Sequence, residues 1–215
     1  MRTTDDPCER SDAAVATPHE APLRRVFVGV KMAPEIAREL ARQAQDLERY
    51  GIRPVSPDDL HLTLVPPWNA DSIPEEIEQL RRAASGFGAF PLTFHHLGYG
   101  PEPRRPRFLW AECAADDALA QLHEALRRAY GATQGRPFRP HVTLARLRDK
   151  GRAIARKHPI DQRLALTQQV ASVELFQSPP AGQRGYRVLA SIALAGEANP
   201  GSAPATATPD RAGGP

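Results

Sequence analysis

Short apolar runs alternate with amphipathic segments along the middle of the chain. β-Branched and aromatic residues are frequent in the short runs, whereas apolar residues recur at helical spacing in the longer segments. The runs predict strands at 25–32, 61–67, 90–100, 107–115, 141–147, 170–178 and 186–196, and the segments predict helices at 34–50, 74–86 and 117–131. A helix precedes the strands at 61–67 and 141–147 alike. We therefore expect an α+β fold of two pseudo-symmetric lobes, with sheets forming a central cleft and helices outside.

The two ends of the chain differ from this middle part in composition. Residues 1–24 and 197–215 are rich in Pro, Gly, Ala, Ser and Thr, and they offer too little apolar surface to offset the entropy lost on ordering. We expect two disordered tails around a single bilobal domain at 25–196. The acidic start of the chain is unlike a secretory signal, and no apolar stretch has the length of a membrane span.

Charge and cysteine content bear on the kind of partner and on the cellular compartment. The 28 Lys and Arg residues nearly balance the 25 Asp and Glu residues, so a net charge of +3 permits an anionic partner without indicating nucleic acid by itself. Basic residues cluster at 103–107 and 135–139, either as a partner site or as solvated loops. Of the two cysteines, Cys8 and Cys113, the first lies outside any apolar pattern. We expect no structural disulfide, and a cytoplasmic, monomeric protein.

Two nearly identical tetrapeptides, HLTL at 61–64 and HVTL at 141–144, stand out along the chain. Side chains alternate between the two faces of a strand, so His61 and Thr63 share one face while the apolar residues occupy the other. The same holds for His141 and Thr143. Because the apolar faces need a core behind them, we expect both His–Thr pairs on the open side, facing each other across one cleft.

These side chains suit proton transfer on a phosphodiester. A neutral imidazole accepts a proton from water while a protonated one donates to the departing alkoxide, and the pKa of histidine lies near neutral pH. Threonine hydroxyls can donate to the non-bridging phosphate oxygens. We expect neither a metal nor a cofactor. His95 and His96 are not a metal pair in this interpretation, because strand neighbours point to opposite faces and no cluster of Cys or acids completes a four-ligand set.

The two tetrapeptides resemble the paired His-x-Thr-x motifs of the two-histidine (2H) phosphoesterases. RPFRPHVTLAR at 136–146 is similar to the second-motif block of their RNA 2′,3′-cyclic phosphodiesterase branch, also called 2′-5′ RNA ligase-like. The opening RVFVGV, SPDDLHLTL at 56–64, PRRPRFLWAE at 103–112 and the LFQS…GYRVLA ending follow in the order of that branch. The resemblance covers most of 25–195. It departs from the branch at VPPWN, residues 65–69, where a basic residue and an aromatic–Leu–Gly turn are usual.

The resemblance implies an enzyme that hydrolyses RNA 2′,3′-cyclic phosphate ends to 2′-phosphomonoesters without metal or ATP. It also implies His61 as the proton donor, His141 as the proton acceptor, and weak 2′-5′ RNA ligase activity. Thr63 and Thr143 are expected to bind the phosphate. Arg146 matches a phosphate-binding arginine of the family, but its odd spacing from His141 places it on the site's face only if the strand ends or bulges just before it.

Two other functions fit the same residues. One is a small cyclic-nucleotide or ADP-ribose cyclic phosphate phosphodiesterase, and the other is a catalytically silent RNA-binding module. Intact His and Thr in both motifs favour the enzyme, because binding alone needs no matched acid and base. The expected partner is RNA with a cyclic phosphate end or a related nucleotide, and no membrane. Trp68, Phe138 and Tyr186 are candidates for stacking on a base, with packing in the core or cleft wall as the alternative for each.

Overall fold

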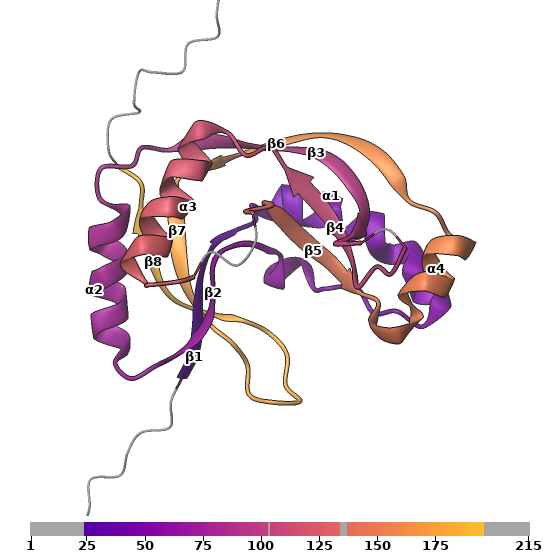
Figure 1. Ribbon diagram of the computed structural model, residues 1–215, viewed down its shortest axis with the longest axis horizontal. Coiled ribbons are helices and arrows are strands. Elements are labelled where there is room, and N and C mark those ends of the chain that lie inside the picture. The colour runs from indigo at the N-terminus through magenta and orange to yellow at the C-terminus, as the bar shows by residue number, and fades with distance from the viewer. Residues whose placement is uncertain (1–23, 103, 134–136, 196–215) are drawn as a thin grey trace, which may run out of the picture.

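The computed structural model describes residues 24–102, 104–133 and 137–195 (Figure 1). One antiparallel sheet of eight strands passes through it, in the order β6-β3-β4-β5-β2-β1-β7-β8. The strands are β1 Arg24–Lys31, β2 His61–Ala70, β3 Phe90–Gly100, β4 Phe108–Cys113, β5 His141–Arg146, β6 Asp161–Val170, β7 Ser172–Gln177 and β8 Arg187–Ala193. The helices are α1 Pro34–Ala44, α2 Ile73–Ala84, α3 Asp117–Ala129 and α4 Gly151–Lys157, and short 3₁₀ helices cover Gln45–Tyr50 (η1), Pro57–Asp59 (η2) and Arg148–Lys150 (η3).

The expected strands and helices are all present, with shifts at their ends, and the structure adds β6 and α4. The helix expected at 34–50 is shorter in the structure. It ends at Ala44 and tightens into η1, which closes at Gly51 in the left-handed conformation with φ 68°. The expected tails lie outside the described residues, except that Arg24 begins β1 instead of ending a tail. Within the described residues, no helix combines the length and apolar content needed to cross a membrane.

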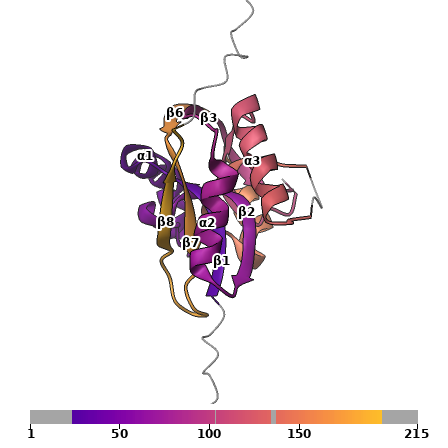
Figure 2. The ribbon, with the colours of Figure 1, turned by 90° about the vertical axis from the view of Figure 1, so that its left-hand side faces the viewer.

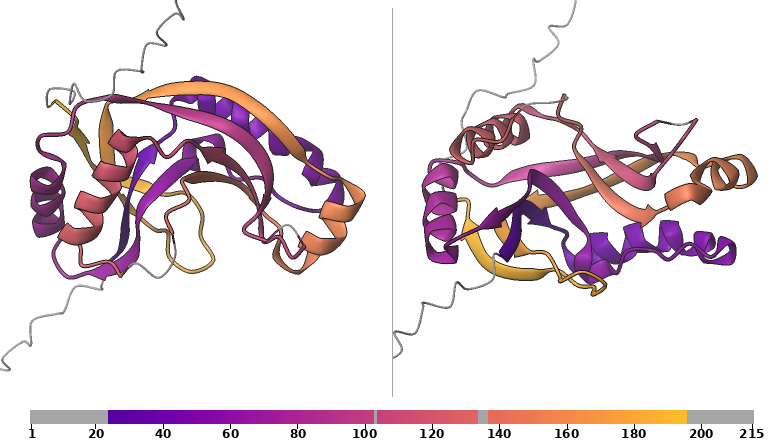
Figure 3. Two further views of the ribbon diagram at one scale, coloured as in Figure 1. Left: turned by 45° about the horizontal axis from the view of Figure 1, so that its top comes forward. Right: turned by 60° about the horizontal axis from the view of Figure 1, so that its bottom comes forward.

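The sheet divides into two halves with the same internal arrangement. One half has the order β2-β1-β7-β8 and the other β5-β4-β3-β6, so the two strands that carry the tetrapeptides lie side by side at the centre. They are paired through Leu62 and Val142. Figure 3 shows that the sheet is bent into an arch along β3 and β6. The expected α+β architecture of two related lobes is confirmed.

Each lobe is covered by helices on its outer side. α2 packs on β7 and β8, and α3 packs on α2 and β2 (Figures 1 and 2). α1 contacts β5 and β6, and α4 lies at the end of the molecule opposite α2. α1 follows β1 yet packs on the other lobe, and α3 follows β4 yet packs against β2. This exchange joins the two lobes through a shared core.

The two central strands direct the same kinds of residue into that core. Leu62, Leu64, Val142 and Leu144 are all no more than 1% exposed, and the alternate positions of both strands are half-buried. The burial sequences of the first five residues of β2 and β5 are identical. Apolar side chains therefore fix both strands against the helices, and the opposite face holds the His and Thr residues.

Candidate active site

The two His–Thr pairs lie on one face of neighbouring strands, as the alternation predicted. They stand side by side in one sheet, where pairs facing each other across a cleft were expected. His61, Thr63, His141 and Thr143 are all half-buried. The strands are antiparallel and pair at Leu62 and Val142. This register sets His61 beside Thr143 and Thr63 beside His141. The structure thus brings together four side chains from segments far apart in the sequence.

Both imidazoles are held in the same way. Nδ1 of His61 lies 2.6 Å from the carbonyl oxygen of Asp59, and Nδ1 of His141 lies 2.7 Å from that of Arg139. A carbonyl oxygen can only accept, so each Nδ1 carries the proton and donates it. In the neutral ring, Nε2 then keeps a free lone pair. The backbone therefore selects one tautomer and leaves Nε2 of both rings available for proton transfer.

A β-bulge in each central strand determines where the next side chains point. The register of β2 against β1 skips Leu64, and the register of β5 against β4 skips Leu144. One extra residue reverses the alternation, so Arg146 comes onto the face of the histidines. Its charge lies close enough to lower the pKa of His61. The bulge required for Arg146 is present, and the corresponding position of β2 holds Pro66, which carries no charge.

His61 is surrounded by aromatic rings. The ring centroids of Phe27 and Phe176 lie 4.8 and 5.5 Å from that of His61, and Tyr186 meets it edge-on at 4.8 Å. The backbone N–H of Tyr186 donates to Oδ1 of Asp59 at 2.8 Å. Burial is the largest influence on His61 and lowers its pKa, while the bond to the Asp59 carbonyl and the Asp59 charge raise it.

His141 packs on Trp110, with ring centroids 4.3 Å apart. The guanidinium of Arg139 lies 5.2 Å from the centre of the Trp110 ring and donates to Glu112 at 2.8 Å. Burial lowers the pKa of His141 most, and the bond to the Arg139 carbonyl and the charge of Glu112 raise it. Both histidines therefore favour the neutral, proton-accepting form in the absence of a bound anion.

The aromatic candidates differ in position. Only Tyr186 of the three contacts a histidine of the site. Trp68 packs on Tyr130, with its indole N–H donating to a carboxylate of α2 at 3.0 Å. Phe138 stacks on His123 of α3, with centroids 3.7 Å apart. Packing is the observed role of Trp68 and Phe138, and Tyr186 forms part of the surroundings of the site.

His95 and His96 contact different acids, as expected for neighbours on a strand. Nε2 of His95 lies 4.0 Å from Glu112, and Nε2 of His96 lies 2.7 Å from Asp161. In the described part of the chain, no three His, Cys, Asp or Glu residues are grouped closely enough to hold a metal ion. Cys113 is a buried free thiol whose pKa is raised by burial, and Cys8 lies outside the described residues.

Sequence reasoning missed the residues that orient the histidines. Asp59 and Arg139 each stand two places before their histidine, and Glu112 is opposite His141 across β4 and β5. The shared offset gave no usable signal, because both contacts come from backbone carbonyls, which every residue carries, and Asp59 lies in η2 rather than on an extended strand. The contact of Asp59 with Tyr186, which is 127 residues away along the chain, left no signal in the sequence.

Comparisons with known proteins agree with this geometry. Residues 33–178 match the profile of the 2′-5′ RNA ligase superfamily. An RNA 2′,3′-cyclic phosphodiesterase of Archaeoglobus fulgidus is 25% identical over 138 residues, covering 61% of this chain and 77% of that protein. One of Bacillus subtilis is 30% identical over 127 residues, covering 56% of this chain and 69% of that protein.

Solved structures show the same fold. TT0787 of Thermus thermophilus superposes with a TM-score of 0.67 at 26% identity, covering 80% of this chain and 99% of that one. LigT of E. coli in its apo form gives a TM-score of 0.65 at 27% identity, covering 81% and 99%. With this fold, these paired strands and a profile match over most of its length, the chain belongs to the 2′-5′ RNA ligase superfamily.

Proposed function

We propose that the protein hydrolyses 2′,3′-cyclic phosphate at RNA ends to a 2′-phosphomonoester, with His61 as proton donor and His141 as proton acceptor. The observation that carries this proposal is the matched pair of imidazoles. Each is tied through Nδ1 to a backbone carbonyl and keeps Nε2 for the reaction. General acid–base catalysis needs two such groups on opposite sides of the reacting phosphorus.

The proposed reaction is a single displacement at phosphorus. Nε2 of His141 takes a proton from water as the water oxygen bonds to phosphorus. The bond from phosphorus to the ribose 3′-oxygen breaks, and Nε2–H of His61 donates its proton to that oxygen, so the phosphate stays on the 2′-oxygen. Thr63, Thr143 and Arg146 stabilise the charge on the non-bridging oxygens. These side chains supply both proton transfers and the positive charge, so the proposal requires no metal and no nucleotide cofactor.

The relatives support a nucleotide phosphate as substrate. The two curated relatives are named RNA 2′,3′-cyclic phosphodiesterases. E. coli LigT has been solved with 3′-AMP and with NADP⁺, and these structures are 27% identical to this chain with TM-scores of 0.64 and 0.62. Weak 2′-5′ ligation is a secondary proposal with the same chemistry. If an RNA 5′-hydroxyl replaces the water, the phosphate held on the 2′-oxygen becomes a 2′-5′ linkage.

A phosphodiesterase for small cyclic nucleotides or for an ADP-ribose cyclic phosphate is the second candidate. Pro66 favours it, because Pro66 stands five places after His61, as Arg146 stands five places after His141, and supplies no charge to a bound phosphate. The same two histidines would act on the smaller substrate. A panel of 2′,3′-cyclic nucleotides, oligonucleotides with cyclic phosphate ends and ADP-ribose 1″,2″-cyclic phosphate, compared by kcat/KM, separates the two candidates.

Substitution of each histidine tests the mechanism. His61→Ala and His141→Ala should each lower kcat by about two to four orders of magnitude, the range for a positioned acid or base. The matched control is His96→Ala, because His96 pairs with Asp161 of β6 and lies outside the proposed site. Phosphorus NMR should identify the product as a 2′-phosphomonoester. Full activity of both site variants, or an equal loss in the control, would overturn the proposal.

A leaving-group test separates the two roles. A substrate with a good leaving group in place of the ribose 3′-oxygen needs little protonation of that group. It should therefore restore activity to His61→Ala far more than to His141→Ala. Equal restoration in both variants would show that donor and acceptor are assigned wrongly, while leaving the two-histidine reaction itself in place.

A further inference from the structure

Two basic segments that are distant in the sequence lie against each other at the end of β5. The β3–β4 loop supplies 104–107, and the end of β5 with η3 and α4 supplies 146–157. The N–H of Leu147 donates to the carbonyl of Arg107 at 2.8 Å, and a Cβ at Gly151 would collide with the carbonyl oxygen of Pro106. The nine cations of this region, called the β5-end surface, are Arg104, Arg105, Arg107, Arg146, Arg148, Lys150, Arg152, Arg156 and Lys157.

The charges of the β5-end surface are exposed and uncompensated. All nine residues are exposed, and none forms an ion pair with an acid among the described residues. Segments 102–107 and 146–157 hold nine cations and two acids, Glu102 and Asp149, whereas the whole chain has 28 and 25. Five arginines on α1, η1, α2 and α3 instead pair with acids three or four residues away, namely Arg42, Arg49, Arg81, Arg127 and Arg128. The β5-end surface therefore carries a large local excess of positive charge.

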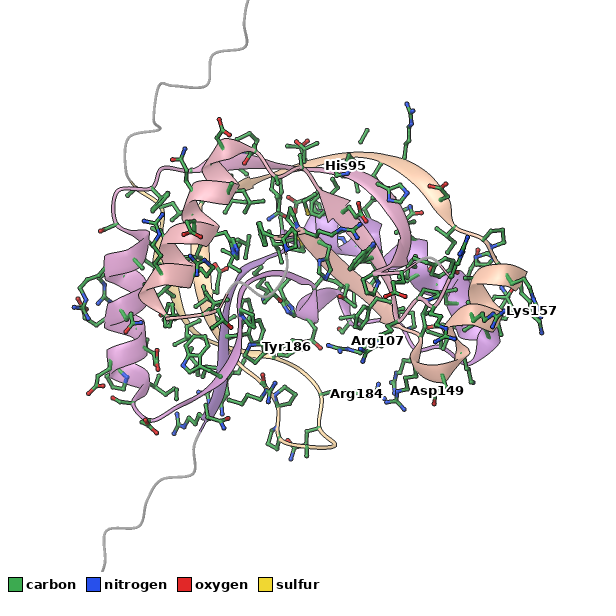
Figure 4. All side chains as sticks on the ribbon, viewed as in Figure 1. His95, Arg107, Asp149, Lys157, Arg184 and Tyr186 are labelled. Carbon is green, nitrogen blue, oxygen red and sulfur yellow. The ribbon has the colours of Figure 1, made fainter. Side chains whose placement is uncertain are left out.

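This surface begins at the proposed active site. The guanidinium carbons of Arg107 and Arg146 lie 5.9 and 5.8 Å from the centre of the same Phe108 ring. Arg146 is also the cation whose charge acts on His61. In Figure 4, Arg107 lies toward Tyr186 and Lys157 lies at the far end of the molecule. The seven residues of α4 extend the surface by about 10 Å at 1.5 Å per residue.

We propose that the β5-end surface binds the phosphodiester backbone of the RNA strand whose terminal cyclic phosphate reacts at His61 and His141. The inference rests on the proposed function and adds where the RNA strand that carries the reacting end is bound. Like charges that share one ring and lack acidic partners are stabilised by a polyanion. Seven of the nine cations are arginines, whose planar groups bind phosphate through two hydrogen bonds. The larger apolar residues of the surface, Leu147 and Ile154, are buried, so neither is available to insert into a lipid membrane.

The test compares two triple variants with the same change in charge. The surface variant is Arg107→Gln, Arg152→Gln and Arg156→Gln. The control variant is Arg24→Gln, Arg25→Gln and Arg82→Gln, which removes exposed cations from β1 and α2. Steady-state kinetics are measured with a cyclic-phosphate-ended oligonucleotide and with a 2′,3′-cyclic mononucleotide. Thermal melting by circular dichroism confirms that both variants are folded.

The surface variant should raise KM for the oligonucleotide at least about tenfold more than KM for the mononucleotide, and the control variant should change that ratio less than about twofold. In wild type, binding of a fluorescent oligonucleotide with a 2′-phosphate end should weaken as salt increases. Each lost phosphate contact lowers the slope of log affinity against log salt by about 0.7 for a single strand, so three lost contacts lower it by about 2.

Binding of the labelled oligonucleotide requires no catalysis, so it separates this inference from the proposed function. If wild type binds through the surface but hydrolyses no cyclic phosphate, the function is wrong and the surface assignment holds. The inference is overturned if the surface and control variants bind the oligonucleotide equally well. It is also overturned if KM for the mononucleotide rises as much as KM for the oligonucleotide, or if wild type binds anionic vesicles in preference to RNA.

Discussion

Asp59 connects the β7–β8 loop to His61, and its substitution gives the sharpest test of how the site is held. Its backbone carbonyl accepts from Nδ1 of His61 at 2.6 Å, while its carboxylate accepts from the N–H of Tyr186 at 2.8 Å. The Tyr186 ring then packs edge-on against His61 with centroids 4.8 Å apart. One residue thus fixes both the tautomer of the imidazole and the ring beside it.

Asp59→Ala removes the side-chain acceptor and should release Tyr186. A hydrogen bond to a charged acceptor contributes about 1.5–3 kcal/mol, and an aromatic contact such as that of Tyr186 with His61 about 1 kcal/mol. Part of this energy orients His61, so we expect kcat to fall about tenfold to a hundredfold, at about 1.4 kcal/mol per factor of ten. Asp59→Asn keeps an oxygen acceptor and should retain kcat within about threefold.

The same pair of variants separates the hydrogen bond from the charge. The Asp59 carboxylate raises the pKa of His61, so Asp59→Asn should shift the His61 limb of the pH–rate profile to lower pH while the loop stays in place. The assay is kcat and KM for a 2′,3′-cyclic nucleotide across pH, with proton NMR of the His61 Nδ1–H. Asp58→Ala is the matched control, because Asp58 is exposed and adjacent. Equal losses in Asp59→Ala and Asp58→Ala, or in Asp59→Ala and Asp59→Asn, would refute the reasoning.

Three further predictions concern the metal, the threonines and acid stability. Activity should survive EDTA, and a loss reversed by a divalent ion would contradict the proposed mechanism. Thr63→Ala or Thr143→Ala should remove about 3 kcal/mol of transition-state stabilisation and so lower kcat, without changing the melting temperature. Unchanged turnover in both variants would make these threonines structural. Burial lowers the pKa of His61, His123 and His141, so the unfolded chain binds more protons near pH 6. The free energy of unfolding in urea should be fully retained above about pH 6.5 and should fall as the pH decreases below it, and a flat dependence between pH 7.5 and 5.5 would contradict this.

The sequence pattern did not predict β6 and α4, and their weak apolar signals have physical reasons. β6 is an edge strand with mostly exposed residues, and only Gln168 and Val170 of its ten residues are buried. Its stability comes from pairing with β3, which no local pattern reveals. α4 has seven residues and buries only Gly151 and Ile154, too few for a helical stripe to stand out. The elements that contribute several core residues were all predictable.

The site was predictable as far as local geometry determines it. The alternation of side chains along a strand was enough to place His61 with Thr63, and His141 with Thr143, on one face. The position of Arg146 followed only conditionally, because a bulge depends on the register between strands. The link from Asp59 to Tyr186 depends on how β8 returns beside β1 through β7, and that is a property of the complete sheet.

The proposed roles of the two histidines are reconciled with their lowered pKa values by the substrate itself. A proton donor must start protonated, yet burial and the charges of Arg146 and His141 lower the pKa of His61. A cyclic phosphate carries one negative charge, and bound between Arg146 and the histidines it offsets this repulsion and favours the imidazolium. Only one ring can gain the proton easily, because two adjacent imidazolium ions repel each other. In the proposed mechanism, substrate binding therefore creates the unequal pair that the reaction needs. The pH profile of kcat reports the enzyme–substrate complex, whereas that of kcat/KM reports the free protein. The His61 limb should therefore lie at higher pH in the kcat profile than in the kcat/KM profile. Identical limbs in the two profiles would show that the phosphate does not protonate His61.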